Sequence, residues 1–184
     1  MRQSNDRRTF IHRLSAGDEI VSVNDAWVAF AAENGAPGLS REAVVGKPLW
    51  GFIEGLDARS LWRALLSRVR GGESPLRAPY RCDSPDCRRS FEMSVRLQPR
   101  GEVEMASRVL RLEPRPPLPL LDAAASRSDQ MVTLCSWCKK VDVGQGQWLE
   151  VEAAVARLDL LGPHPPPQVT HGMCDACRDR YGSE

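Results

Sequence analysis

The chain has 184 residues, 25 basic against 24 acidic side chains, and a hydrophobic fraction of 42%. This composition is typical of a globular protein and excludes a disordered chain, while a general polyanion binder would be more basic. The longest uninterrupted apolar run, residues 26–32, is too short to cross a membrane. The charged residues 1–8 are not followed by an apolar segment, so no secretory signal is expected and the protein is expected to be cytoplasmic.

The first 120 residues contain a run of helices between two runs of strands. In chain order the sequence predicts strands at 10–14 and 20–24, a helix at 26–34, a helical turn at 40–44, a helix at 58–70, and strands at 76–82, 91–97 and 103–112. The last strand changes its apolar phase near Ser107, which predicts a bulge there. This order predicts an α+β fold, with helices packed on an antiparallel sheet.

Two short motifs in this unit carry a resemblance to a known family. Asn24-Asp-Ala-Trp27 follows the second strand, and Val45-Gly-Lys47 precedes the long helix. Together with the order of elements and the length, they resemble PAS domains. The resemblance implies a five-stranded antiparallel sheet with helices on one face. It also implies a sensing or protein-docking role, in which the partner is either another protein or a second copy of the chain bound through this domain.

The chemistry known for PAS domains requires particular residues. No cysteine lies within 50–56 and no histidine within 58–70, so neither flavin nor haem is expected. A small-molecule pocket, if formed, would be lined by aromatic residues that otherwise serve as core: Trp27, Trp50, Trp62 and Tyr80. His12 is the one histidine of this unit, and we expect it to be a surface residue or a hydrogen-bonded core residue.

The hairpin around residue 84 is rich in arginine and holds two of the six cysteines. Its arginines predict a solvated face, with an anion-binding or partner-binding surface as the alternative: Arg77, Arg81, Arg88, Arg89 and Arg96. Cys82 is expected to be a buried residue on the apolar side of its strand, and Cys87 has no assigned role. The segment 80–89 resembles a hairpin signature in a group of bacterial PAS-like proteins.

A change of composition separates this unit from the rest of the chain. Residues 113–119 are rich in proline, and residues 123–130 are small and polar. We therefore predict a PAS-like domain over 1–120, a linker over 121–130 and a zinc-binding module over 131–184.

The C-terminal module carries two Cys-x2-Cys pairs separated by 35 residues. Two residues between cysteines let one turn direct both thiolates at one ion, and two such pairs complete the tetrahedron of a structural zinc. The predicted ligands are Cys135, Cys138, Cys174 and Cys177. His171 is a candidate substitute ligand or a hydrogen-bond donor to a ligand. An iron centre in the same cysteines and a redox-switched zinc site remain as alternatives.

The residues between the two pairs predict a helix at 148–161 with one apolar face, followed by a proline-rich loop that exposes His164. A unit this small is marginal without additional stabilisation, which a metal would supply, so we expect it to be partly unfolded without metal. The three stretches 135–141, 148–152 and 170–177 resemble a C-terminal segment of some bacterial PAS-containing signalling proteins, which implies a role in signal transduction.

We expect no enzymatic activity, because the sequence has no phosphate loop, nucleophile elbow or zinc-protease motif. Nucleic-acid binding is not expected, since residues 131–184 hold five basic and seven acidic residues and four zinc-bound thiolates would add negative charge. Together with the resemblance to bacterial PAS-containing signalling proteins, this implies a non-enzymatic bacterial regulatory protein. A redox or metal sensor and a nucleic-acid-associated transcriptional regulator are the alternatives.

Overall fold

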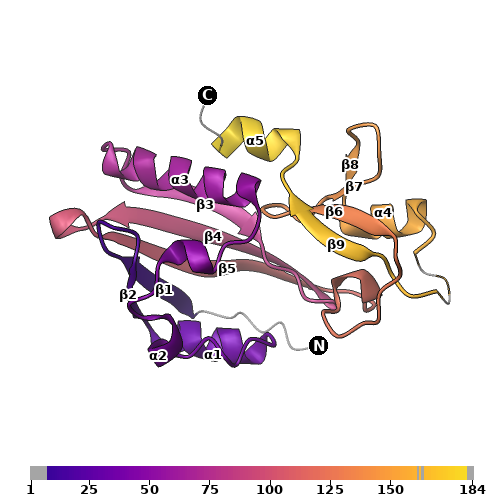
Figure 1. Ribbon diagram of the computed structural model, residues 1–184, viewed down its shortest axis with the longest axis horizontal. Coiled ribbons are helices and arrows are strands. Elements are labelled where there is room, and N and C mark those ends of the chain that lie inside the picture. The colour runs from indigo at the N-terminus through magenta and orange to yellow at the C-terminus, as the bar shows by residue number, and fades with distance from the viewer. Residues whose placement is uncertain (1–7, 161, 163, 182–184) are drawn as a thin grey trace.

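The structure is a computed structural model that describes residues 8–160, 162 and 164–181. Figure 1 shows two sheets side by side, each with helices packed against it. Residues 8–118 form β1 (Thr9–Leu14), β2 (Ile20–Val23), α1 (Asp25–Glu33), α2 (Arg41–Val44), η1 (Leu49–Gly51), α3 (Leu56–Arg70), β3 (Leu76–Arg81), β4 (Cys87–Leu97), η2 (Pro99–Gly101) and β5 (Val103–Pro114). The rest of the described chain forms η3 (Pro119–Leu121), β6 (Met131–Cys135), β7 (Val141–Asp142), β8 (Trp148–Leu149), α4 (Val151–Arg157), β9 (Gln168–Gly172) and α5 (Asp175–Tyr181).

The larger sheet has the strand order β2-β1-β5-β4-β3, and all its neighbouring strands are antiparallel. Alternate residues of β4, such as Phe91, Met93 and Val95, are buried beneath α1 and α3. The opposite face carries charged pairs, among them Arg13 with Glu104. One face is thus covered by helices and the other faces solvent, which confirms the predicted α+β fold with a PAS-like five-stranded sheet.

The Asn24 side chain shows what the first motif of the sequence does at this turn. Its Oδ1 accepts hydrogen bonds from the backbone N–H groups of Trp27 (2.9 Å) and Ile11 (3.1 Å), and its Nδ2 donates to the Thr9 carbonyl (2.8 Å). Asn24 therefore caps α1 and at the same time fixes that helix to strand β1.

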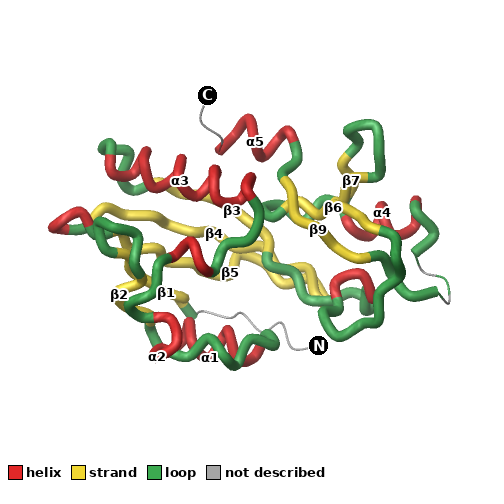
Figure 2. Tube along the Cα trace, in the orientation of Figure 1, coloured by secondary structure: helices red, strands yellow, loops and turns green. Residues whose placement is uncertain are grey.

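The smaller sheet has the strand order β8-β7-β6-β9. Strands β6 and β9 are parallel, and the connection between them runs through β7, β8 and α4. Leu118 and Leu120, which precede the predicted linker, are buried against Val151 and Val155 of α4. Figure 2 shows the two groups of strands joined by a long loop that carries η3.

The segment predicted as a linker makes several contacts in the structure. The Arg127 guanidinium donates to the carbonyls of Leu120 (3.1 Å), Asp122 (2.6 Å) and Pro167 (3.1 Å), and Ser128 N–H donates to Pro166 O (2.9 Å). The domain boundaries stay a prediction, but residues 121–130 are held against the smaller sheet. None of the helices in the described ranges has the length and apolar character needed to span a bilayer.

Three local expectations differ from the structure. The bulge in β5 lies at Leu110, because Ser90 pairs with Arg111 while the next residue, Phe91, pairs with Val109. The helix predicted at 148–161 is shorter, because its first two residues pair with β7 as strand β8 and only Val151–Arg157 is helical; residue 161 lies outside the described residues. Cys82 is half-buried, because β3 ends one residue before it.

Candidate metal centre and adjoining cavity

The parallel pairing of β6 with β9 brings the two Cys-x2-Cys pairs together. Cys135 is the last residue of β6 and pairs with Gly172, the last residue of β9. Both strands therefore end on the same side of the sheet, where one cysteine pair begins with the last residue of β6 and the other follows β9. Lys139 follows the first pair with a φ of +63°, a left-handed conformation that turns the chain back tightly.

The four predicted ligand sulfurs gather in one place. The Sγ atoms of Cys135, Cys138, Cys174 and Cys177 all lie within 4.8 Å of one another. The Sγ atoms of Cys138 and Cys174 are 3.6 Å apart. Tetrahedral zinc with Zn–S bonds of about 2.3 Å requires sulfurs about 3.8 Å apart, whereas a disulfide requires about 2.05 Å. The donor set and its spacing thus fit a tetrahedral metal ion and do not fit disulfides.

Hydrogen bonds between the thiols shift the pKa values of the cysteines in opposite directions. Thiols of Cys138 and Cys177 donate to the Cys135 sulfur and hold the pKa of Cys135 far below its usual range. The same contacts to Cys135 raise the pKa of Cys138 to about 12 and raise that of Cys177. A divalent cation would replace the remaining protons, which is the usual chemistry of thiolate metal sites. The Cys174 N–H also donates to Cys135 Sγ, at 3.5 Å.

His171 lies apart from this cluster. Its side chain is exposed on β9, and it is not among the residues whose ligand atoms converge. Alternation along a strand accounts for this, because His171 and Gly172 point to opposite faces of the sheet. The structure therefore gathers the four-cysteine set and leaves the candidate substitute outside it.

A cavity of about 170 Å³ lies between the larger sheet and its helices. It is lined by Phe10, His12, Trp27, Phe30, Trp62, Tyr80, Met93, Ser107 and Trp137. Three of the four residues predicted to line a pocket are present. The fourth, Trp50, lies outside the cavity, with the Arg63 guanidinium 4.9 Å from its ring centroid.

The cavity has few polar groups among its aromatic walls. Burial lowers the pKa of His12 to about 4, so its imidazole is neutral at physiological pH. Burial also raises the pKa of Tyr80 to about 12, next to the Ser107 hydroxyl. Within the described part of the chain the half-buried His12 side chain makes no hydrogen bond, so it is a cavity residue and not the hydrogen-bonded core residue that was one of the two expectations. Its place on the inner face follows from strict alternation with Phe10 and Leu14.

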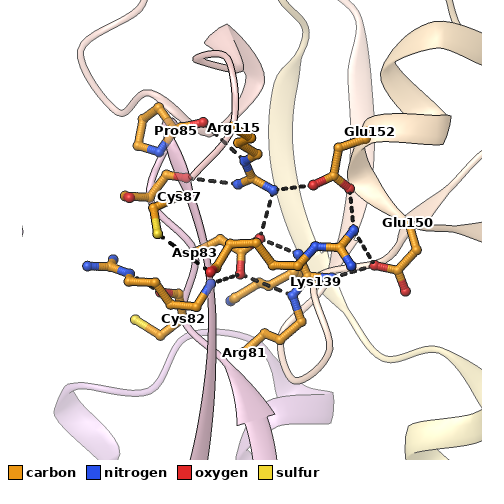
Figure 3. Close-up of polar contacts among 12 residues, drawn as sticks. Arg81, Cys82, Asp83, Pro85, Cys87, Arg115, Lys139, Glu150 and Glu152 are labelled. Atoms are coloured by element: carbon orange, nitrogen blue, oxygen red, sulfur yellow. Dashed lines mark hydrogen bonds and ion pairs between the residues drawn. The ribbon is translucent and has the colours of Figure 1, made fainter. Parts of the chain in front are cut away.

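Ion pairs at the arginine-rich hairpin connect the two units. Figure 3 shows Arg81 and Arg115 on either side of Asp83, with Glu150 and Glu152 approaching from the segment around the start of α4. Arg115 contacts Asp83 at 3.1 Å and Glu152 at 2.6 Å. The Asp83 side chain is 1% exposed and that of Arg115 8% exposed. We call these five residues the interdomain clamp.

The clamp corrects in part the expectation that the hairpin presents a solvated face, because Arg77 and Arg96 are exposed as expected whereas other arginines are not. Arg88, just beyond the clamp, contacts Glu152 at 2.7 Å, so two of the five hairpin arginines, Arg81 and Arg88, pair with the C-terminal module. Burial alone would raise the pKa of Glu152, but the hydrogen bonds from Arg88 and Arg115 outweigh it and lower that pKa to about 2. The Glu152 carboxylate therefore stays ionised at neutral pH and remains paired with Arg88 and Arg115.

No protein-family model matches the chain, and no curated protein matches it either. Among solved structures, it is similar to a domain of the sensory box sensor histidine kinase/response regulator from Geobacter sulfurreducens, with 24% identity and a TM-score of 0.39 over 54% of this chain and 82% of that one. It is also similar to the PAS domain of the RpfR quorum-sensing receptor from Cronobacter turicensis in complex with BDSF, with 15% identity and a TM-score of 0.42 over 60% and 99% of the two chains. A third is a sensory box sensor histidine kinase from Vibrio cholerae, with 13% identity and a TM-score of 0.40 over 58% and 84%.

These neighbours are PAS or sensory box domains of bacterial sensors. The order of elements and strands described above defines the chain itself as a PAS-like α+β protein. It carries, in addition, a C-terminal cluster of four cysteines arranged as a possible metal site.

Proposed function

We propose that this protein is a non-enzymatic regulator of bacterial signal transduction, in which a PAS-like sensing domain is joined to a module built around one structural zinc ion. The observation that carries the proposal is the convergence of four cysteine sulfurs within 4.8 Å at the ends of two parallel strands. A set of four thiolates closes the coordination of zinc and leaves no position for a substrate, which favours a structural role.

The surroundings of the cysteines support a structural metal. Cys135, Cys174 and Cys177 are buried, and they belong to the same apolar cluster as α3 and the inner face of the larger sheet. Zinc would therefore fix the packing of α5 against the sensing domain as well as the fold of its own module. Reduced thiols of this kind persist in a reducing compartment, which supports a cytoplasmic location.

Metal analysis combined with thiol titration tests the metal assignment. We expect one zinc per chain, and two reactive thiols, Cys82 and Cys87, in the protein as purified. Removal of the metal by a chelator should expose all six thiols. A chain that holds no metal, or that readily forms a disulfide within the first cysteine pair, would contradict the proposal. Release of zinc by mild oxidant with reversible loss of packing would instead support the redox-sensor alternative.

Two matched serine variants distinguish a cysteine that is expected to bind zinc from one that is not. Cys138→Ser removes a half-buried member of the cluster and should abolish stoichiometric zinc binding. Cys87→Ser removes an equally half-buried cysteine outside the cluster and should leave one zinc per chain. Equal zinc content in the two variants would argue against a four-cysteine site.

We propose that the output of the protein is binding, either to a second copy of the chain or to another protein. PAS-like domains are compact scaffolds, and the fold alone does not define the chemistry. Light scattering over a range of concentrations tests the homodimer. A strictly monomeric protein would leave a heterologous partner as the remaining route of signalling.

A further inference from the structure

Trp137 is shared by the candidate metal site and the cavity. In the sequence it lies between two predicted metal ligands, Cys135 and Cys138. In the structure its ring forms part of the cavity wall, although the other lining residues all come from the sensing domain. A single buried side chain thus connects the cysteine cluster with the interior of the sensing domain.

The free edge of β3 fixes the position of Trp137. The indole Nε1–H donates to the Pro79 carbonyl at 2.7 Å, and the Arg81 N–H donates to the Trp137 carbonyl at 2.9 Å. Proline is tolerated here because β3 is an edge strand and its missing N–H breaks no ladder hydrogen bond. The turn between the cysteines therefore docks on β3 with defined geometry, which requires that the turn itself be folded.

The Trp137 ring also contacts aromatic residues of both units. Its centroid lies 5.9 Å from that of Trp62 in an edge-to-face arrangement, and 5.8 Å from that of Tyr80. On its other side it lies 5.1 Å from Tyr181 of α5, the helix that carries Cys177. If the turn between the cysteines lost its fold, Trp137 would leave the cavity wall. Trp62 and Tyr80 would then lose its packing and become less well held.

The lining of the cavity defines the chemistry of a ligand that would fit it. A volume of about 170 Å³ is close to the roughly 150 Å³ of an engineered cavity that binds benzene. The walls carry no permanently charged side chain, so an ionic ligand would be desolvated without a counter-charge. The unpaired His12 imidazole and the Ser107 hydroxyl offer hydrogen bonds to one polar group. The fitting class is a small, uncharged aromatic molecule with one hydrogen-bonding group.

We propose that Trp137 couples the two sites, so that zinc at the four cysteines and a small uncharged aromatic ligand in the cavity bind cooperatively. This inference rests on the proposed zinc centre and sensing role. Zinc orders the turn that places Trp137 in the wall, and a ligand packed on Trp137 stabilises that same turn. Because the coupling is an equilibrium property, each must raise the affinity of the other by the same factor.

Phenol is a suitable probe, and the full-length chain can be titrated with it by calorimetry in the zinc-loaded and the chelator-treated states. We expect phenol to bind at least about fivefold more weakly after zinc removal, the lower end of typical coupling between sites. The reciprocal measurement, zinc affinity in competition with a chromophoric chelator, should show the same factor when phenol is added.

Two tryptophan variants test whether Trp137 transmits the effect. Trp137→Ala keeps all four cysteines and should still bind one zinc, but its phenol affinity should no longer depend on zinc. Trp50→Ala is the matched control, because Trp50 lies outside the cavity and the coupling should persist. Undiminished coupling in Trp137→Ala would overturn the role of this residue.

Toluene tests the ligand class, because it has the size of phenol and no hydrogen-bonding group. His12→Leu should lower phenol affinity relative to toluene affinity by at least about fivefold, the cost of one lost buried hydrogen bond. Failure of phenol and toluene to bind would overturn the ligand class. Zinc binding and phenol binding that are independent would overturn the coupling and leave the proposed function intact, whereas absence of zinc binding would refute the proposed function itself.

Discussion

The two sheets of this protein differ in what stabilises them. The larger sheet is built on β4 and β5, strands of eleven and twelve residues paired along their length, and α3 covers its inner face. In the smaller sheet, β7 and β8 have only two residues each, and the helix packed against it, α4, has seven. The first buries a large core, whereas the second buries a smaller cluster around Val141, Val151 and Val155, and we expect it to need stabilisation from outside its sheet as well. The interdomain clamp supplies part of this stabilisation, and a metal ion at the four cysteines would supply the rest.

Removal of the metal should have the largest effect on stability, and that effect should be confined to the smaller sheet. Structural zinc contributes on the order of 10 kcal/mol to the folding of small modules. We expect chelation to abolish the protection of backbone amides in β6 and β9 against hydrogen exchange. Amides of β4 and β5 should keep most of their protection. Equal loss in both sheets would show that the two units fold as one, and no loss would show that the smaller sheet stands without metal.

Breaking the clamp should cost less but should still be easily measured. Arg115→Met removes a guanidinium that is 8% exposed and leaves Asp83, 1% exposed, with one partner fewer. Removal of one member of a buried ion pair typically costs about 3–5 kcal/mol, and urea unfolding should report a loss of that order. Arg108→Met is the control: its pair with Glu92 is 58% exposed on the arginine side, and such pairs contribute less than about 1 kcal/mol. Similar losses in the two variants would contradict the proposed importance of the clamp.

Sequence patterns predicted the local structure well because local structure depends on local spacing. Strict alternation over 91–97 marked β4, and the apolar stripe of 58–70 marked α3. The spacing of the cysteine pairs likewise marked the four residues that converge. Each of these signals is contained within a few residues or in a fixed number of intervening positions.

The contacts between units could not be predicted in the same way. A tryptophan between two cysteines carries no signal that its indole will donate to Pro79, 58 residues away in the chain. An arginine-rich hairpin looks solvated until the acidic partners, Glu150 and Glu152, are brought to it by the fold. Residues Trp148–Leu149 fit an apolar helix by spacing, and only their pairing with β7 makes them a strand. In each case a distant partner decides the outcome.

The smallest of the three effects concerns His12 and distinguishes the cavity beneath the larger sheet from the rest of the molecule. Its pKa is lowered to about 4 by burial, against an ordinary value of 6.5. Between these two values the unfolded chain binds a proton that the folded chain does not, so this group destabilises the fold as the pH falls from 6.5 to 4. The loss is at most about 3 kcal/mol, complete near pH 4 and absent above pH 7. The Tyr80 hydroxyl, with a pKa near 12, stays neutral throughout this window.

His12→Gln and His12→Leu both remove this titration while differing in polarity and shape. In each, the free energy of unfolding relative to the wild type should improve by up to about 3 kcal/mol between pH 7 and pH 4, whatever the offset at pH 7. Zinc release at low pH affects all three proteins alike and cancels in the comparison. Parallel pH curves for the wild type and both variants would show that His12 is hydrated in the folded protein. The cavity would then be open to bulk water, and it would not be expected to prefer an uncharged aromatic ligand.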